Sequence, residues 1–305
     1  MTSRPDLAGF LPSLIDLSIR AGAAILDVYA TGVLETERKA DASPLTLADR
    51  TSHELIDAGL RGLTPEVPIL SEEGRAIRWS ERRSWTELWL VDPLDGTKEF
   101  IKGNGEFTVN IAFIRGNEPV LGVIYAPVRR VAWFGLAGAN GVARRMSAEA
   151  LSEFQADAVP RGEPPRPDAL RRSNAARRSG AAPQSLGEPI SVRERDERTL
   201  TVIASRTHRN EATEAFISRV GAHYEDVRTI NVGSSLKLCY LAEGRADLYP
   251  RYAPTSEWDT AAGHAIIRAA GGEIYRADPD AGRTDEPLAY NKEDLLNPSF
   301  VACAW

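Results

Sequence analysis

The chain has 305 residues, 43% of them hydrophobic and 26% charged, which is the composition of an ordinary globular protein. Its net charge of −6 argues against a general nucleic-acid binder, although it does not exclude a small anionic ligand. Cys239 and Cys303 show no metal-ligand spacing and cannot form a disulfide framework. The N-terminus shows no signal-peptide pattern, and no stretch approaches the ~18 apolar residues of a membrane span. We therefore expect a cytoplasmic protein without an integral membrane segment, with peripheral association at the inner face of the membrane left open.

The first part of the chain predicts two helices followed by a series of strands. Apolar residues recur at helical spacing over residues 11–29, and a second helical pattern follows Asp49 and stops at Gly62. Apolar runs and alternation then predict strands at residues 67–70, 88–91, 107–114, 120–125 and 131–134. Consecutive strands of this kind indicate a mostly antiparallel sheet flanked by helices.

Residues 145–190 differ in character, because prolines there are mixed with arginine pairs. We expect a surface loop or linker between two domains, at 1–190 and 191–305. The second domain shows strand–helix alternation, which predicts an α/β architecture. Its predicted strands are 200–204 and 246–249, and its predicted helices are 211–220, 234–242 and 258–270.

The strongest chemical signal is the pair Asp92 and Asp95, which stand on either side of Pro93-Leu94 at the end of the predicted strand 88–91. Two carboxylates this close repel each other unless a cation lies between them. Oxygen ligands at this density suit Mg²⁺. Gly96 allows close backbone approach, and Thr97 begins a segment whose free N–H groups could hold a phosphate. A plain Asp-Pro turn is the alternative.

Further acids could join this pair. Glu72 and Glu73 follow the predicted strand 67–70; we expect Glu72 to point inward and Glu73 to be solvated. Asp259 stands at the start of a predicted helix, where it could either cap the helix or bind a metal ion.

Three segments together resemble the inositol monophosphatase superfamily, a group of lithium-sensitive phosphatases: 70–73 (Leu-Ser-Glu-Glu), 89–97 (Trp-Leu-Val-Asp-Pro-Leu-Asp-Gly-Thr) and 258–263 (Trp-Asp-Thr-Ala-Ala-Gly). Residues 98–101, 104–110, 233–237 and 248–252 extend the resemblance to its 3′(2′),5′-bisphosphate nucleotidase branch. It covers residues 10–300 except the stretch rich in proline and arginine. It implies an α+β or α/β fold, a layered αβαβα sandwich of the sugar-phosphatase type, whose first domain carries the metal site and whose second completes it and binds the nucleotide.

The resemblance also implies roles for single residues. A first Mg²⁺ would be held by Glu72, Asp92 and the carbonyl of Leu94, a second by Asp92, Asp95 and Asp259, and a weaker third near Glu72. Asp49 and Thr97 would orient the attacking water. For Asp49, the N-cap of the helix that follows it is the other interpretation, and the two roles are compatible.

For the substrate, the resemblance implies that Ser234, Lys237 and Arg251 hold a second phosphate and the base, with His208 close to the nucleotide. Two cations suit a phosphate, although an exposed helix lysine and an ordinary turn histidine are the alternatives. The other expected substrate-binding residues are Glu72, Leu94, Asp95, Gly96, Thr97 and Asp259.

The expected reaction is Mg²⁺-dependent hydrolysis of 3′(2′)-phosphoadenosine 5′-phosphate to AMP and phosphate, a step that recycles a by-product of sulfate activation. An inositol monophosphatase or a related sugar-phosphate phosphatase is the alternative. The expected partner is the small nucleotide substrate rather than polymeric nucleic acid, and assembly into a homodimer stays open.

Overall fold

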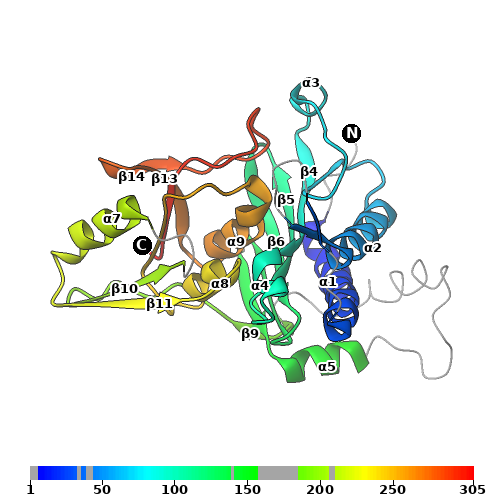
Figure 1. Cartoon of the computed structure of the whole chain (residues 1–305), viewed down its shortest axis with the longest axis horizontal. Helices are drawn as coiled ribbons and strands as arrows, with labels where there is room; N and C mark the ends of the chain where they lie inside the picture. Colours follow the sequence, from blue (N-terminus) through cyan, green and yellow to red (C-terminus); the bar gives the residue numbers. More distant parts are fainter. Residues whose placement is uncertain (1–5, 33–35, 39–43, 139–140, 157–184, 206–209) are drawn as a thin grey trace.

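The computed structural model describes residues 6–32, 36–38, 44–138, 141–156, 185–205 and 210–305 (Figure 1). Its first sheet has seven strands: β3 (Ile69–Ser71), β4 (Glu87–Asp95), β5 (Thr108–Arg115), β6 (Glu118–Ala126), β7 (Val131–Leu136), β8 (Val142–Met146) and β9 (Glu188–Pro189), paired in that order. Its second sheet has six strands, in the order β11 (Asp226–Asn231), β10 (Thr199–Ala204), β12 (Leu248–Arg251), β15 (Phe300–Cys303), β13 (Glu273–Asp278) and β14 (Gly282–Pro287).

Helices lie on both sides of each sheet, which gives the expected αβαβα layering (Figure 1). Helices α1 (Leu7–Thr31) and α2 (Leu47–Leu63) cover one face of the first sheet. Helices α8 (Leu236–Ala242) and α9 (Glu257–Ala269) lie between the two sheets, and α7 (Glu211–Gly221) packs on the far face of the second. The remaining described elements are short: β1 (Thr36–Arg38), β2 (Pro44–Thr46), α3 (Trp79–Arg82), α4 (Thr97–Ile101) and α5 (Ala148–Ala156).

The strand β4 is buried on both faces, which explains its continuous apolar run. Trp89 and Val91 belong to the core under α1 and α2, whereas Leu88 and Leu90 belong to the core shared with α8 and α9. Successive side chains of a strand point to opposite faces, so a strand between two helical layers needs apolar residues at every position. In this sheet only the β3–β4 pair is parallel; the other pairs are antiparallel, as expected.

The second helix begins earlier than its pattern indicates. It starts at Leu47 because Thr46 is its N-cap. Asp49 is therefore not the N-cap itself but the third residue of the helix, where its side chain accepts the Thr46 backbone N–H in a capping box. The strands β11, β13 and β14 carry no clear apolar alternation because most of their residues are exposed or half-buried, and the sequence did not predict them.

The loop prediction for residues 145–190 was wrong for part of that range. Residues 148–156 form α5, whose Leu151 packs into the core beneath α1, and β9 pairs with β8. A helix can form here because its Leu151 side chain is anchored in the core. Residues 157–184, which hold that segment, lie outside the described residues.

Among the described helices, α1 is long and apolar enough to cross a membrane, with a mean hydropathy of 1.4 in its most apolar window. This corrects the expectation that no stretch approaches that length and composition. However, 56% of the same window is buried inside the fold. Its apolar residues, such as Leu14 and Ile15, belong to the core against the first sheet, which is the ordinary role of a core helix.

Helix α9 lies close against the first sheet at Gly122 of β6. A Cβ atom added there would lie 2.2 Å from the backbone oxygen of Ala262. Because the contact is with backbone, the added atom fits only if the helix moves. We expect Gly122→Ala to lower the free energy of unfolding by about 1–3 kcal/mol or more, because overpacking displaces α9. Urea unfolding measures the effect.

The control is Gly62→Ala in α2, where no described heavy atom beyond the neighbouring backbone of α2 lies within 4 Å of the added Cβ. Alanine is the better helix former, so this variant should gain up to about 1 kcal/mol. Equal stability of the two variants would contradict the packing of α9 on β6.

Candidate active site

The end of β4 carries Asp92 and Asp95 on an irregular turn of the strand. Asp92 pairs with Asn110 of β5 and Asp95 with Thr108, so two residues of β4 stand opposite one residue of β5. This bulge bends the strand and re-aims the side chains that follow it. Pro93 is tolerated within this interior strand because a bulge needs no ladder N–H at that point. The Asp-Pro step is therefore a bulge rather than a plain turn.

Asp259 reaches the same place from α9. One carboxylate oxygen from each of Asp92, Asp95 and Asp259 lies within 4.8 Å of the other two. Asp259 is the third residue of α9, and its Oδ2 accepts a hydrogen bond from the backbone N–H of the N-cap Ser256 at 2.9 Å. The two interpretations of Asp259, a helix-capping acid and a member of the cluster, are thus compatible.

Glu72 approaches the cluster from the turn after β3. Because β3 runs parallel to β4, the end of β3 lies beside the end of β4, and the Glu72 N–H donates to the carbonyl oxygen of Val91 at 3.1 Å. The Glu72 side chain is hydrogen-bonded to Asp92. Glu73, which was expected to be solvated, is half-buried in the same turn.

The electrostatics of this cluster favour a bound cation. Asp92 is 1% exposed, and burial raises its pKa well above the usual range, with Glu72, Asp95 and Asp259 adding to the effect. Burial, followed by the charge of Asp95, raises the pKa of Asp259 to about 8. Such a set of carboxylates fits a hard divalent cation, which would replace mutual repulsion by attraction.

Asp49 and Thr97 meet beside the cluster, as the resemblance implies. The Thr97 hydroxyl donates to Asp49 Oδ1 at 3.2 Å, and it also lies 3.4 Å from the carbonyl oxygen of Leu94. The other carboxylate oxygen of Asp49 accepts the backbone N–H and the hydroxyl of Thr46. This capping box holds Asp49 buried and in a fixed orientation toward Thr97.

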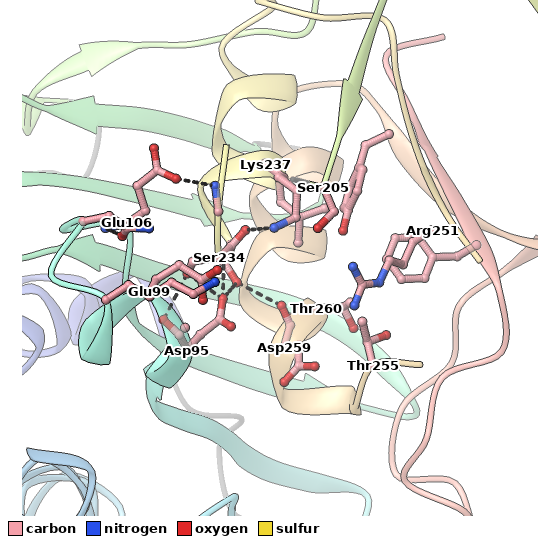
Figure 2. A pocket seen from close by; sticks show the side chains of 18 residues that line it. Asp95, Glu99, Glu106, Ser205, Ser234, Lys237, Arg251, Thr255, Asp259 and Thr260 are labelled. Carbon is pink, nitrogen blue, oxygen red and sulfur yellow. Dashed lines mark hydrogen bonds between the residues drawn. The ribbon is translucent and has the colours of Figure 1, made fainter. Parts of the chain in front are cut away.

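A cavity of about 310 Å³ opens between the acidic cluster and the second sheet (Figure 2). Asp95 and Asp259 lie on one side of it, and Lys237 and Arg251 line it as well. Lys237 is 8% exposed, so the interpretation of an exposed helix lysine was wrong. Its Nζ donates to the carbonyl oxygen of Ser234 at 2.5 Å, and burial lowers its pKa to about 8.

Not every predicted residue lines this cavity. Gly96 and Ser234 do, whereas Glu72, Leu94 and Thr97 are not among its lining residues. His208 lies outside the described residues. Residues that the sequence did not assign also line it: Glu99, Glu106, Ser205, Ser235, Tyr249 and Thr255. Several of them belong to the segments that resemble the family, but a local sequence pattern does not predict which side chains of a segment point into a cavity.

Comparison with known proteins agrees with this architecture. The model of the inositol monophosphatase family matches residues 6–304. A 3′(2′),5′-bisphosphate nucleotidase, CysQ, from Salmonella typhimurium is 41% identical over 292 residues, which cover 95% of this chain and 98% of that protein. The CysQ of Escherichia coli K12 is 40% identical with the same coverage. The crystal structure of CysQ from Bacteroides thetaiotaomicron superposes with a TM-score of 0.76 at 41% identity and covers 97% of each chain. The chain therefore belongs to the inositol monophosphatase family.

Proposed function

We propose that this protein is a 3′(2′),5′-bisphosphate nucleotidase that hydrolyses 3′(2′)-phosphoadenosine 5′-phosphate to AMP and phosphate. One observation carries the proposal: a single cavity has an acidic cluster suited to divalent cations at one side and the buried cations Lys237 and Arg251 elsewhere in its lining. Such a cavity offers separate places for two phosphates. The identity of about 40% to CysQ nucleotidases over most of the chain supports the same substrate class. A free nucleotide substrate also suits a cytoplasmic enzyme, the location that we propose.

We assign the acidic cluster to two or three Mg²⁺ ions. Glu72, Asp92 and the Leu94 carbonyl would hold the first ion, and Asp92, Asp95 and Asp259 the second. When bound, Mg²⁺ neutralises the phosphate charge, activates water and stabilises the leaving oxygen. The chain itself contributes the Asp49–Thr97 pair. Because the Thr97 hydroxyl donates its one proton to Asp49, the lone pairs of its oxygen can accept a hydrogen bond from the attacking water and orient it.

The second phosphate is assigned to Lys237 and Arg251. The Arg251 guanidinium is itself held in place, since Nε donates to the Ala253 carbonyl at 3.1 Å and Nη2 to the Pro254 carbonyl at 3.2 Å. A fixed arginine fork and a buried ammonium group suit a phosphate dianion. A substrate with one phosphate, such as an inositol monophosphate, has no use for this second cationic region.

A phosphate-release assay tests the substrate class. We expect 3′-phosphoadenosine 5′-phosphate to be hydrolysed with a higher kcat/KM than inositol 1-phosphate, with activity lost when Mg²⁺ is chelated and reduced by Li⁺. Faster turnover of inositol 1-phosphate would reverse the assignment. Activity that persists in a chelator would remove the metal ions from the mechanism.

A further inference from the structure

One oxygen of Asp95 is saturated by hydrogen bonds from a single loop. Asp95 Oδ2 accepts the Ser234 hydroxyl at 2.7 Å (Figure 2). It also accepts the Ser235 backbone N–H at 2.6 Å and the Ser235 hydroxyl at 2.7 Å. Ser234 adopts a φ of 54°, a left-handed conformation that costs a non-glycine residue energy and persists only where its surroundings enforce it. The loop is thus held in a shape that directs three donors at Oδ2.

The Ser235 hydroxyl is itself oriented from the first sheet. A serine hydroxyl carries one proton, which it can give to only one acceptor at a time. Asn110 Nδ2 donates to Ser235 Oγ at 2.9 Å, so that oxygen serves as an acceptor toward β5 and its own proton is directed elsewhere. The Thr108 hydroxyl also lies 2.8 Å from Ser234 Oγ, and it can donate its proton to Asn110 Oδ1 at 2.9 Å, a contact that favours this orientation of the Asn110 amide.

Two acceptors then compete for the Ser235 proton: Asp95 Oδ2 at 2.7 Å and the backbone carbonyl oxygen of Asp259 at 3.0 Å. The carboxylate is both nearer and charged, and charge-assisted hydrogen bonds are shorter and stronger. Ser235 is 3% exposed, so water does not compete for the same groups. Ser235 therefore donates its hydroxyl proton to Asp95 of the first sheet, and the same oxygen lies 3.0 Å from the Asp259 carbonyl oxygen in α9.

We propose that Ser235, oriented by Asn110, is a positioning residue that fixes the Asp95 carboxylate for metal binding. This inference rests on the proposed function only in that the acidic cluster binds divalent cations. Groups that hydrogen-bond to a metal ligand set its orientation, and their loss lowers metal affinity by about 10- to 100-fold. Ser235 acts through Asp95 and touches no reacting atom.

The test measures the binding of Mn²⁺ to Ser235→Ala directly, by electron paramagnetic resonance in the absence of substrate. The variant loses the hydroxyl but keeps the backbone N–H, and its affinity for Mn²⁺ should fall by about 10-fold or more. In activity assays the Mg²⁺ concentration for half-maximal rate should rise by a similar factor, whereas kcat at saturating Mg²⁺ should change less. Asn110→Leu, which removes the group that orients Ser235, should weaken Mn²⁺ binding in the same direction.

The control is Ser18→Ala, another buried serine, whose hydroxyl donates to the Leu14 carbonyl oxygen within α1 at 2.9 Å and is remote from the cluster. It should bind Mn²⁺ as the wild type does. Unchanged Mn²⁺ affinity in Ser235→Ala, or an equal loss in Ser18→Ala, would overturn the inference. A wild type that binds no Mn²⁺ would overturn it together with the metal assignment. A wild type that binds Mn²⁺ but does not hydrolyse the bisphosphate would refute the nucleotide substrate alone.

Discussion

Asp92→Asn is expected to lower phosphate release by at least about a thousandfold at any Mg²⁺ concentration, because it removes the charge at the centre of the acidic cluster. Asp92 interacts with Glu72, Asp95 and Asp259 together. Asparagine has the same shape, and its Oδ1 can still accept the Leu94 N–H, which lies 3.0 Å from Asp92 Oδ1. The fold should therefore persist while the affinity for a hard cation is lost.

The same substitution should stabilise the metal-free protein. Burial and the neighbouring carboxylates raise the pKa of Asp92 in the folded state above its unfolded value. The folded state then holds the proton more tightly, so the free energy of unfolding of the wild type falls as the pH rises above about 4, until the folded pKa is passed. Asparagine has no such proton to lose, and the variant should unfold at a higher temperature than the wild type in a chelator at neutral pH.

Thermal unfolding with and without Mg²⁺ separates these effects. Mg²⁺ should raise the Tm of the wild type and leave that of Asp92→Asn nearly unchanged. The control Asp57→Asn alters a carboxylate that pairs with Arg61 on the surface of α2 and should change neither activity nor the response to Mg²⁺. Wild-type turnover by Asp92→Asn would show that the cluster is not the metal site.

The acidic cluster could be predicted because its signals are local. A strand buried on both faces reads as an unbroken apolar run, and Asp92 and Asp95 stand where that run ends. Asp49 and Asp259 also carry a local signal. Both are the third residue of a helix, after Thr46 and Ser256 respectively, and the spacing Ser/Thr-x-x-Asp indicates a capping box.

The rest of the site depends on contacts between distant segments. The burial of Lys237 follows from packing of the short helix α8 between two sheets, whereas its sequence alone also allowed an exposed lysine. The orientation of Ser235 depends on Asn110, which is 125 residues earlier in the chain and belongs to the first sheet. Sequence spacing cannot predict such a contact, because both partners are small polar residues that come together only when the chain has folded.

Lys237→Met is expected to raise KM for 3′-phosphoadenosine 5′-phosphate by about 10- to 100-fold, because a charged hydrogen bond to the 5′-phosphate is lost. Methionine fills similar space in the core around α8 without a charge. The matched substrate is 3′-AMP, which has the same scissile phosphate and no 5′-phosphate, and its KM should change little. Lys102→Met, which alters an exposed lysine lining the same cavity, should have the smaller effect on the bisphosphate.

The pH dependence gives an independent measurement of the same residue. Burial lowers the pKa of Lys237 to about 8 in the ligand-free protein, although Asp95 opposes the shift. Below that pH the ammonium form is ready for a phosphate dianion; above it, binding must first restore the proton, so KM for the bisphosphate should rise from pH 8 to pH 9. Dividing by KM for 3′-AMP at each pH removes effects that arise at the acidic cluster, since both substrates share them. The ratio of the two KM values should rise with pH in the wild type and stay constant in Lys237→Met. A constant ratio in both proteins, or an equal increase of KM for both substrates in Lys237→Met, would show that Lys237 does not bind the second phosphate.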